Sequence, residues 1–153
     1  MLAAPELSHV CDLEVDVGPI RDLGTMPHGR RRLVVILGGV VSGPRLAGDI
    51  LPGGADWQYV RDDGSVELVA RYAIKTTAGP EIAVSNRGIR RAAPEVLARL
   101  AAGEPVDPAL IYFRTIPTFE APDGAFSWLN RSLFLANAVR LPDKVKLRVF
   151  EVG

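Results

Sequence analysis

The sequence is poor in several residue types on which whole classes of protein depend. It contains a single cysteine, Cys11, so no disulfide forms within the chain, and this composition fits a reducing compartment. Its two histidines, His9 and His28, have no Cys, His or carboxylate at metal-ligand spacing, so no metal site is expected. No apolar run reaches the ~18 residues of a membrane span, and no signal peptide is recognisable. The sequence therefore predicts a cytoplasmic protein with no membrane partner.

An excess of either charge is also lacking. The 18 lysines and arginines balance 18 aspartates and glutamates, so no overall field attracts nucleic acid, and no nucleic-acid partner is expected. The run Arg30-Arg31-Arg32 is interpreted as the solvated start of a strand. The G-x-S-x-G elbow, the Rossmann fingerprint and the phosphate loop are absent, which argues against serine hydrolases and nucleotide-dependent enzymes.

Short hydrophobic segments separated by turn residues make up most of the chain. The clean alternation from Leu7 to Val17, broken only at Val10, is typical of a half-buried strand. One short helix is predicted near 94–102, because Pro94 suits a first helical turn and Gly103 follows the end. Further strands are predicted at 32–37, 40–41, 45–51, 56–61, 65–76, 81–87, 111–116, 119–120, 126–139 and 145–152. Roughly ten short strands and one helix predict a single domain over 1–153, an antiparallel β-barrel or sandwich.

The segment from Leu51 to Trp57, Leu-Pro-Gly-Gly-Ala-Asp-Trp, is the most informative stretch of the chain. It places a carboxylate, Asp56, beside a large aromatic ring at the start of a hydrophobic strand. A carboxylate there is costly in a core unless something pairs with it. Two interpretations stay open: Asp56 lines a pocket, or it accepts hydrogen bonds from the turn amides of Gly53 and Gly54.

Other polar and aromatic side chains recur on the predicted strands. Alternation places Asp56 and Gln58 on one strand face, and Arg71 on the face opposite Tyr72. It also pairs Tyr112 with Arg114, and Trp128 with Asn130. In a small barrel these sets could converge on one cavity, with the mixed lining typical of a small-molecule site. Each arginine alone is explained better by a solvated outer face, so the functional interpretation depends on their co-occurrence.

Several motifs together resemble a known family. They occur in the order Gly38-Gly39, Ser42-Gly43-Pro44-Arg45-Leu46, Leu51 to Trp57, Asn86-Arg87-Gly88, Tyr112-Phe113-Arg114-Thr115 and Trp128-Leu129-Asn130. This pattern, from about Leu7 to Val152, resembles the domain-of-unknown-function 3237 family, also called uncharacterised protein family 0311. The resemblance implies a closed antiparallel β-barrel of about 8–10 strands, similar to the allene oxide cyclase and dirigent barrels. It implies no agreed activity.

Two functional hypotheses follow. The first is a cofactor-independent cyclase, isomerase or lyase acting on a small oxygenated, partly hydrophobic or aromatic metabolite inside the barrel. The second is a barrel that binds such a molecule without catalysis. A third possibility is a structural homo-oligomer with a filled barrel, and near-neutral charge is compatible with a homodimer.

The first hypothesis assigns a role to each candidate residue. Asp56 acts as general acid or base, and Arg87 and Arg114 bind a carboxylate or enolate oxygen. The predicted catalytic residues are Asp56, Arg87, Tyr112 and Arg114, and the predicted substrate-binding residues are Trp57, Arg71, Tyr72, Glu120, Trp128 and Asn130.

Overall fold

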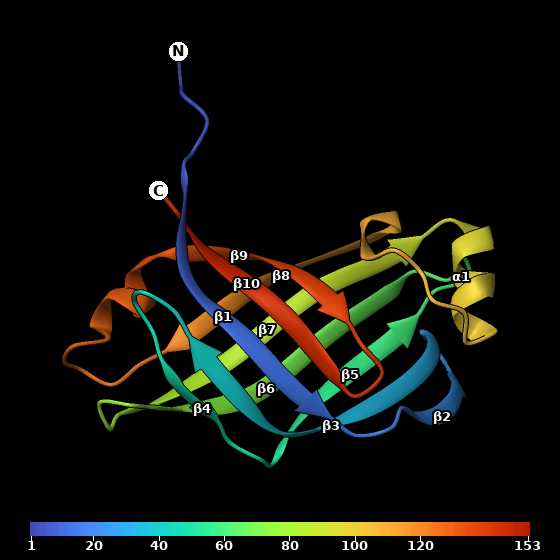
Figure 1. The fold of residues 1–153 in the computed structure, drawn as a ribbon, viewed down its shortest axis with the longest axis horizontal. Helices are drawn as coiled ribbons and strands as arrows, with labels where there is room; N and C mark the ends of the chain where they lie inside the picture. Colours follow the sequence, from blue (N-terminus) through green and yellow to red (C-terminus); the bar gives the residue numbers. More distant parts are fainter.

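The computed structural model describes residues 1–153 and shows an antiparallel β-barrel (Figure 1). Ten strands form one sheet: β1 (Leu7–Val17), β2 (Arg21–Met26), β3 (Gly29–Ser42), β4 (Gly48–Ile50), β5 (Gly54–Val60), β6 (Val66–Thr76), β7 (Glu81–Ala92), β8 (Ile111–Glu120), β9 (Leu133–Arg140) and β10 (Lys144–Val152). The helical segments are α1 (Pro94–Ala101) and the 3₁₀ turns η1 (Pro108–Leu110) and η2 (Ser127–Arg131). None of these helices is long and apolar enough to cross a membrane.

The wall of the barrel has eight strand positions. β4 and β5 share one position, because both lie between β3 and β6. β2 adds no position, because it pairs only with the first half of β3, on the edge whose second half pairs with β1. The pairing of β1 with both β10 and β3 closes the ring. The predicted closed barrel and the predicted helix near 94–102 are both confirmed.

Two glycines allow β3 to change partners as it curves. Its first half pairs with β5, and its second half pairs with β4 and β1. Gly39 has a φ of +147°, and a Cβ there would lie 2.0 Å from the carbonyl oxygen of Glu14 in β1. In β4, which pairs with this half of β3, a Cβ at Gly48 would lie 2.1 Å from the carbonyl oxygen of Lys75 in β6. Because only glycine tolerates both the φ angle and the close contact, these positions permit the sharp bend that closure requires.

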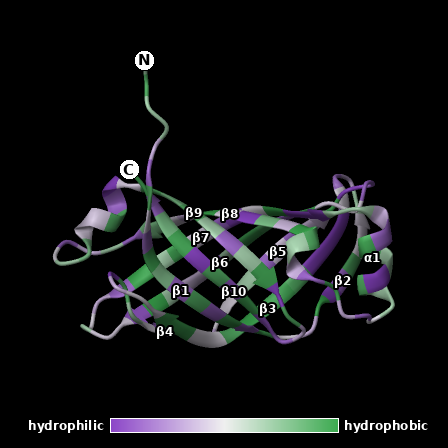
Figure 2. Ribbon diagram, turned by 45° about the horizontal axis from the view of Figure 1, so that its top comes forward, coloured by the Kyte–Doolittle hydropathy of each residue, from purple (hydrophilic) through white to green (hydrophobic).

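The hydrophobic core fills the barrel, and alternation along each strand assigns side chains to the inside or the outside. On β6, Val66, Leu68, Tyr72 and Ile74 are buried inside, whereas Arg71 faces solvent. Figure 2 shows the corresponding alternation of hydrophobic and hydrophilic bands along the strands.

The exception at Val10 has a local cause. The register of β1 against β10 shifts between His9 and Cys11, which marks a β-bulge. The bulge allows Val10 and Cys11, although adjacent, to be fully buried together.

Several predicted boundaries are wrong. β7 continues five residues beyond Arg87, to Ala92, because it stays paired with β8 over that length. The predicted strand over 126–139 is the 3₁₀ turn η2 followed by the shorter strand β9. β2 was not predicted, since its side chains are mostly exposed and show no alternation. Arg32 lies near the start of β3, as predicted, but it is half-buried on the inward face that it shares with Val34.

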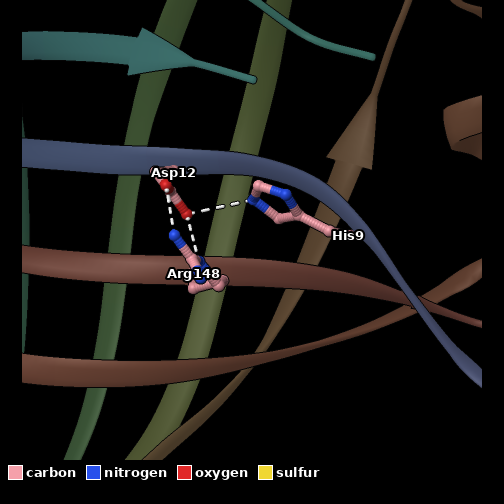
Figure 3. A network of polar contacts seen from close by, with 3 residues as sticks. All are labelled: His9, Asp12 and Arg148. Carbon is pink, nitrogen blue, oxygen red and sulfur yellow. Dashed lines mark hydrogen bonds and ion pairs between the residues drawn. The ribbon is translucent and has the colours of Figure 1, made fainter. Parts of the chain in front are cut away.

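An ion-pair network spans the seam between β1 and β10 on the outside of the barrel (Figure 3). Arg148 donates two hydrogen bonds to Asp12, from Nε at 2.8 Å and Nη2 at 2.9 Å. His9 Nε2 lies 3.1 Å from the same carboxylate. The hydrogen bonds from Arg148 are the main reason that the pKa of Asp12 is lowered. The network ties the two strands together but is too exposed to contribute much stability.

Candidate functional site

A polar chain runs along the inner wall of the barrel from β3 to β5. Arg32 lies directly opposite Gln58 in the register and donates to Gln58 Oε1 from Nη2, at 2.8 Å, and from Nε, at 3.2 Å. Gln58, only 2% exposed, donates from Nε2 to Asp56 Oδ2 at 2.8 Å. Asp56 accepts this bond rather than bonds from the turn amides of Gly53 and Gly54. The chain holds the carboxylate in one orientation and leaves its second oxygen, Oδ1, free.

A small cavity lies next to Asp56 inside the barrel. Its volume is about 40 Å³, room for a few water molecules. Four buried side-chain atoms with no hydrogen-bond partner belong to residues that line it: Asp56 Oδ1, Tyr72 Oη, Asn86 Oδ1 and Thr115 Oγ1. Asn86 and Thr115 are 3% and 2% exposed. Buried polar atoms are rarely left unpaired, because each loses its hydrogen bonds to water. Four such atoms around one cavity are therefore the strongest sign of a ligand site.

The sheet register explains why these residues meet. Ala70 in β6 pairs with Asp56 on one side and with Asn86 on the other, so the two polar residues lie at the same level of the wall. Gly88, two residues along β7, pairs with Thr115 in β8. The rest of the cavity is apolar, with Val15, Ile36, Phe113 and Leu147 among its walls.

The electrostatics of the interior are unusual for a core. Burial raises the pKa of Asp56 against the opposing effects of the Gln58 hydrogen bond and of nearby arginines. Burial likewise raises the pKa of Tyr72, so its hydroxyl stays protonated and can donate a hydrogen bond. An aspartate that holds its proton to higher pH than usual is suited to acid–base chemistry.

Three arginines face inward at the end of the barrel that carries α1. Arg32 lies near the start of β3, Arg90 near the end of β7, and Arg140 ends β9. Each shares the inward parity of its buried neighbours and is itself half-buried. Burial lowers the pKa of all three, that of Arg90 to about 10. Their charges act on Asp56 through space, although none forms an ion pair with it.

The structure does not bring the ten predicted site residues to one cavity. Only Asp56 and Tyr72 line the interior cavity. Trp57, Arg87, Tyr112 and Arg114 line a groove of about 890 Å³ on the outside of the wall, and Arg71 also faces outward. The outward direction follows from alternation, since the neighbours of these residues are buried inside. Their contact with a ligand stays a prediction.

The other three predicted residues lie at the far end of the barrel from the arginines. Glu120 is the exposed last residue of β8. Trp128 packs against Phe134, with ring centroids 6.0 Å apart. Asn130 donates to the carbonyl of Ala121 and accepts from its amide, both at 2.8 Å. The packing of Trp128 agrees with the hypothesis of a filled structural barrel. The cavity beside Asp56 does not agree with it.

Sequence reasoning missed six inward polar residues: Arg32, Gln58 as a site residue, Asn86, Arg90, Thr115 and Arg140. On β7 a usable signal was present, because Ile82 and Val84 are both apolar. Continuing their alternation places Asn86 and Arg90 inside and Arg87 outside. On β8 no such signal exists, since Tyr112 and Ile116 on the outer face are as apolar as the inner Phe113.

The remaining reactive groups do not add a second site. Burial raises the pKa of the Cys11 thiol to about 12, which leaves it protonated and unreactive. No group of three His, Cys, Asp or Glu side chains is placed to hold a metal ion together.

A family model and curated relatives match nearly the whole chain. The family model described as "Protein of unknown function (DUF3237)" matches residues 5–152. The chain belongs to this family. A UPF0311 protein of Rhodopseudomonas palustris is 41% identical over 147 residues, which cover 96% of each chain. A UPF0311 protein of Clostridium acetobutylicum is 45% identical over 125 residues, 82% of this chain and 79% of the relative.

Solved structures share the same fold. A crystal structure of the Rhodopseudomonas palustris protein, of unknown function, has a TM-score of 0.94 at 39% identity and covers 99% of this chain and 100% of its own. A β-barrel-like protein of Acinetobacter baumannii has a TM-score of 0.87 at 34% identity, with 100% and 99% covered. An enzyme from Penicillium herquei, at 18% identity and a TM-score of 0.74, covers 100% of this chain and 98% of its own. At that identity the likeness concerns the fold alone.

Proposed function

We propose that the protein is a cofactor-independent enzyme, a cyclase, isomerase or lyase, that acts on a small oxygenated molecule inside the barrel. The observation that carries the proposal is the buried, unpaired Oδ1 of Asp56 at the interior cavity. Gln58 occupies the other carboxylate oxygen, so Oδ1 is the atom that exchanges a proton with the substrate. Asp56 thus has a defined orientation and a free reacting atom, both of which general acid–base catalysis requires.

The neighbouring groups supply substrate orientation. Asn86, Thr115 and Tyr72 each present a polar atom without a protein partner at the same cavity. A carbonyl or hydroxyl oxygen of the substrate would complete their hydrogen bonding, and the apolar walls would exclude water from the reacting carbon. Arg32 acts as a positioning residue, because it contacts Gln58 and reaches Asp56 only through it.

The cavity is small, so binding requires side-chain movement. About 40 Å³ does not admit a metabolite of several carbon atoms. The half-buried Arg32, Arg90 and Arg140 lie between the cavity level and the barrel end. Arg90 and Arg140, whose side chains donate no hydrogen bond, can change rotamer at modest cost. Their displacement would open this end to a substrate while Arg32 keeps its contact with Gln58.

The test is turnover by an isosteric variant. A panel of small phenols, enones, lactones and hydroxy acids is screened for compounds that raise the thermal unfolding temperature of the protein. Each such compound is then incubated with the protein and analysed by mass spectrometry. We expect a mass-neutral rearrangement or loss of water or a small fragment. Asp56→Asn should reduce the rate by roughly 10²–10⁴-fold, the usual contribution of a general acid or base, while the compound still binds.

A matched control is Asp62→Asn, at an exposed acid in the β5–β6 turn, which should leave the rate unchanged. Full turnover in Asp56→Asn would contradict the acid–base role. A stabilising compound that is recovered unaltered by the wild-type protein would instead identify a non-catalytic binding barrel.

A further inference from the structure

Positive charge is in excess inside the barrel. Arg32, Arg90 and Arg140 face inward at one end, and Asp56 is the one acid that faces inward with them. Two other acids act on these arginines from outside the lumen, Asp22 on Arg32 and Asp143 on Arg140. Asp22, however, is already bonded to Arg30. The interior therefore has an unneutralised positive charge.

This arrangement is unfavourable without an anion. Arg32 and Arg140 repel Arg90, in addition to the burial of its own charge. A buried charge is normally tolerated only when it is paired and hydrogen-bonded. Arg90 and Arg140 donate no side-chain hydrogen bond, and Arg32 donates only to the neutral Gln58. Guanidinium groups left with free donors are the usual protein partners of carboxylates and other planar anions.

We propose that the barrel takes its small molecule as an anion, a carboxylate or an ionised enol or phenol, whose charged oxygen is bound by Arg32, Arg90 and Arg140. This deepens the proposed function and rests on its placement of the substrate inside the barrel. The charged end lies towards the end that carries α1, and the reacting end lies deeper, at Asp56.

The register gives the approximate spacing of the two ends. Arg32 lies opposite Gln58, and Asp56 is two residues further along β5, about 7 Å by strand geometry. A benzoate-sized molecule spans such a distance. The apolar residues at the Asp56 level, among them Val15, Ile36 and Phe113, suit a hydrocarbon or aromatic body and not a second charge.

The experiment compares carboxylates with their neutral amides. Four carboxylates are titrated into the wild-type protein, each in parallel with its neutral amide: formate, acetate, benzoate and cinnamate. Binding is followed by the chemical shifts of the protein's backbone N–H groups in NMR spectra. We expect at least one carboxylate to bind tenfold or more tightly than its amide, with shifts at the arginine end. Added salt should weaken the binding of the carboxylate but leave the binding of the amide unchanged.

Two variants and a matched control locate the charge. Arg90→Gln and, independently, Arg140→Gln should each lose tenfold or more of the affinity for the carboxylate while retaining that for the amide. Arg91→Gln changes the adjacent residue on the outer face of the same strand and should bind as the wild type does. The anion site is overturned if every amide binds as tightly as its carboxylate, or if Arg91→Gln loses as much affinity as Arg90→Gln.

The anion site and the proposed function fail separately. Asp56→Asn removes the one inward-facing acid, so it should retain or tighten carboxylate binding while turnover is lost. If carboxylate binding depends on the arginines but Asp56→Asn turns over normally, the proposed function is wrong and the anion site stands. If turnover requires Asp56 but the neutral amides bind equally well, the anion site is wrong and the proposed function stands.

Discussion

The two ends of the barrel differ in how their interiors are filled. The end that carries η2 is closed by buried hydrophobic residues: Leu46, Phe119, Leu129 and Phe134. The rings of Phe119 and Phe134 meet edge to face, with centroids 5.0 Å apart. The end that carries α1 instead has three half-buried arginines at its inward positions. One end thus resembles an ordinary core, and the other holds groups that ordinary cores exclude.

The difference is consistent with the proposed function, in which one end stabilises the fold and the other binds a ligand. Burial of aromatic rings stabilises the fold, whereas burial of uncompensated arginines opposes it. Proteins often retain such unfavourable groups where binding or catalysis needs them. Substitutions at the two ends should therefore change stability in opposite directions.

The largest expected effect is at the hydrophobic end. Phe134→Ala removes a side chain that is 1% exposed and should lower the free energy of unfolding by about 3–5 kcal/mol. Urea denaturation followed by tryptophan fluorescence measures it. The adjacent Leu133, 73% exposed, provides the control, and Leu133→Ala should change stability by less than about 0.5 kcal/mol. Equal effects of the two substitutions would show that this end is not a packed core.

At the arginine end the sign should reverse. Arg90→Met replaces a half-buried charge that lacks an ion-pair partner with an apolar side chain of similar length and should raise the free energy of unfolding by about 1–4 kcal/mol. The same denaturation experiment applies, with Arg91→Met on the outer face as a control that should be nearly neutral. A clear loss of stability in Arg90→Met alone would mean that Arg90 is held by favourable interactions within the chain.

A smaller effect is expected for the loop that covers the hydrophobic end. Asn130→Ala removes the two hydrogen bonds to the backbone of Ala121 and should lower the free energy of unfolding by about 1–3 kcal/mol, since each bond contributes about 0.5–1.5 kcal/mol. Thermal unfolding provides the measurement. Asn137→Ala, at an outward position of β9, serves for comparison. If Asn130→Ala lost no more stability than Asn137→Ala, Asn130 would not anchor η2.

The smallest expected effect is a dependence of stability on pH that arises from Asp56. Burial raises the pKa of Asp56 above its ordinary value of 3.8, so the folded state holds the proton to higher pH than the unfolded chain does. The stability that this supplies is complete below 3.8 and is lost as pH rises through the folded-state pKa. Asp56→Asn should flatten that part of the stability curve in urea denaturation, whereas Asp62→Asn should not. A curve unchanged by Asp56→Asn would mean that Asp56 titrates as an exposed acid.

Much of the barrel was predictable from local pattern. The strand over Leu7–Val17 and the proline that begins α1 depend on neighbouring residues, and both are confirmed. The predicted alternation is confirmed only from Cys11 onward, because the bulge at Val10 turns Leu7 and His9 to the outer face. The shared face of Asp56 and Gln58 is confirmed for the same reason, and the two side chains are hydrogen-bonded. Local pattern failed at 126–139, where η2 interrupts the expected strand. It failed again at Arg32, because a run of three arginines suggests exposed side chains, whereas the alternation of β3 turns Arg32 to the inward face.

By itself the sequence determined most of the strands, the one helix, an antiparallel all-β fold and the presence of a polar pair next to Trp57. These features follow from side-chain periodicity, which is encoded over a few residues. Only the tertiary structure decided that Arg32, Arg90 and Arg140 share one end and that Asn86 and Thr115 face Asp56. Those residues lie on strands far apart in the chain, and closure of the sheet alone determines which face becomes the inside.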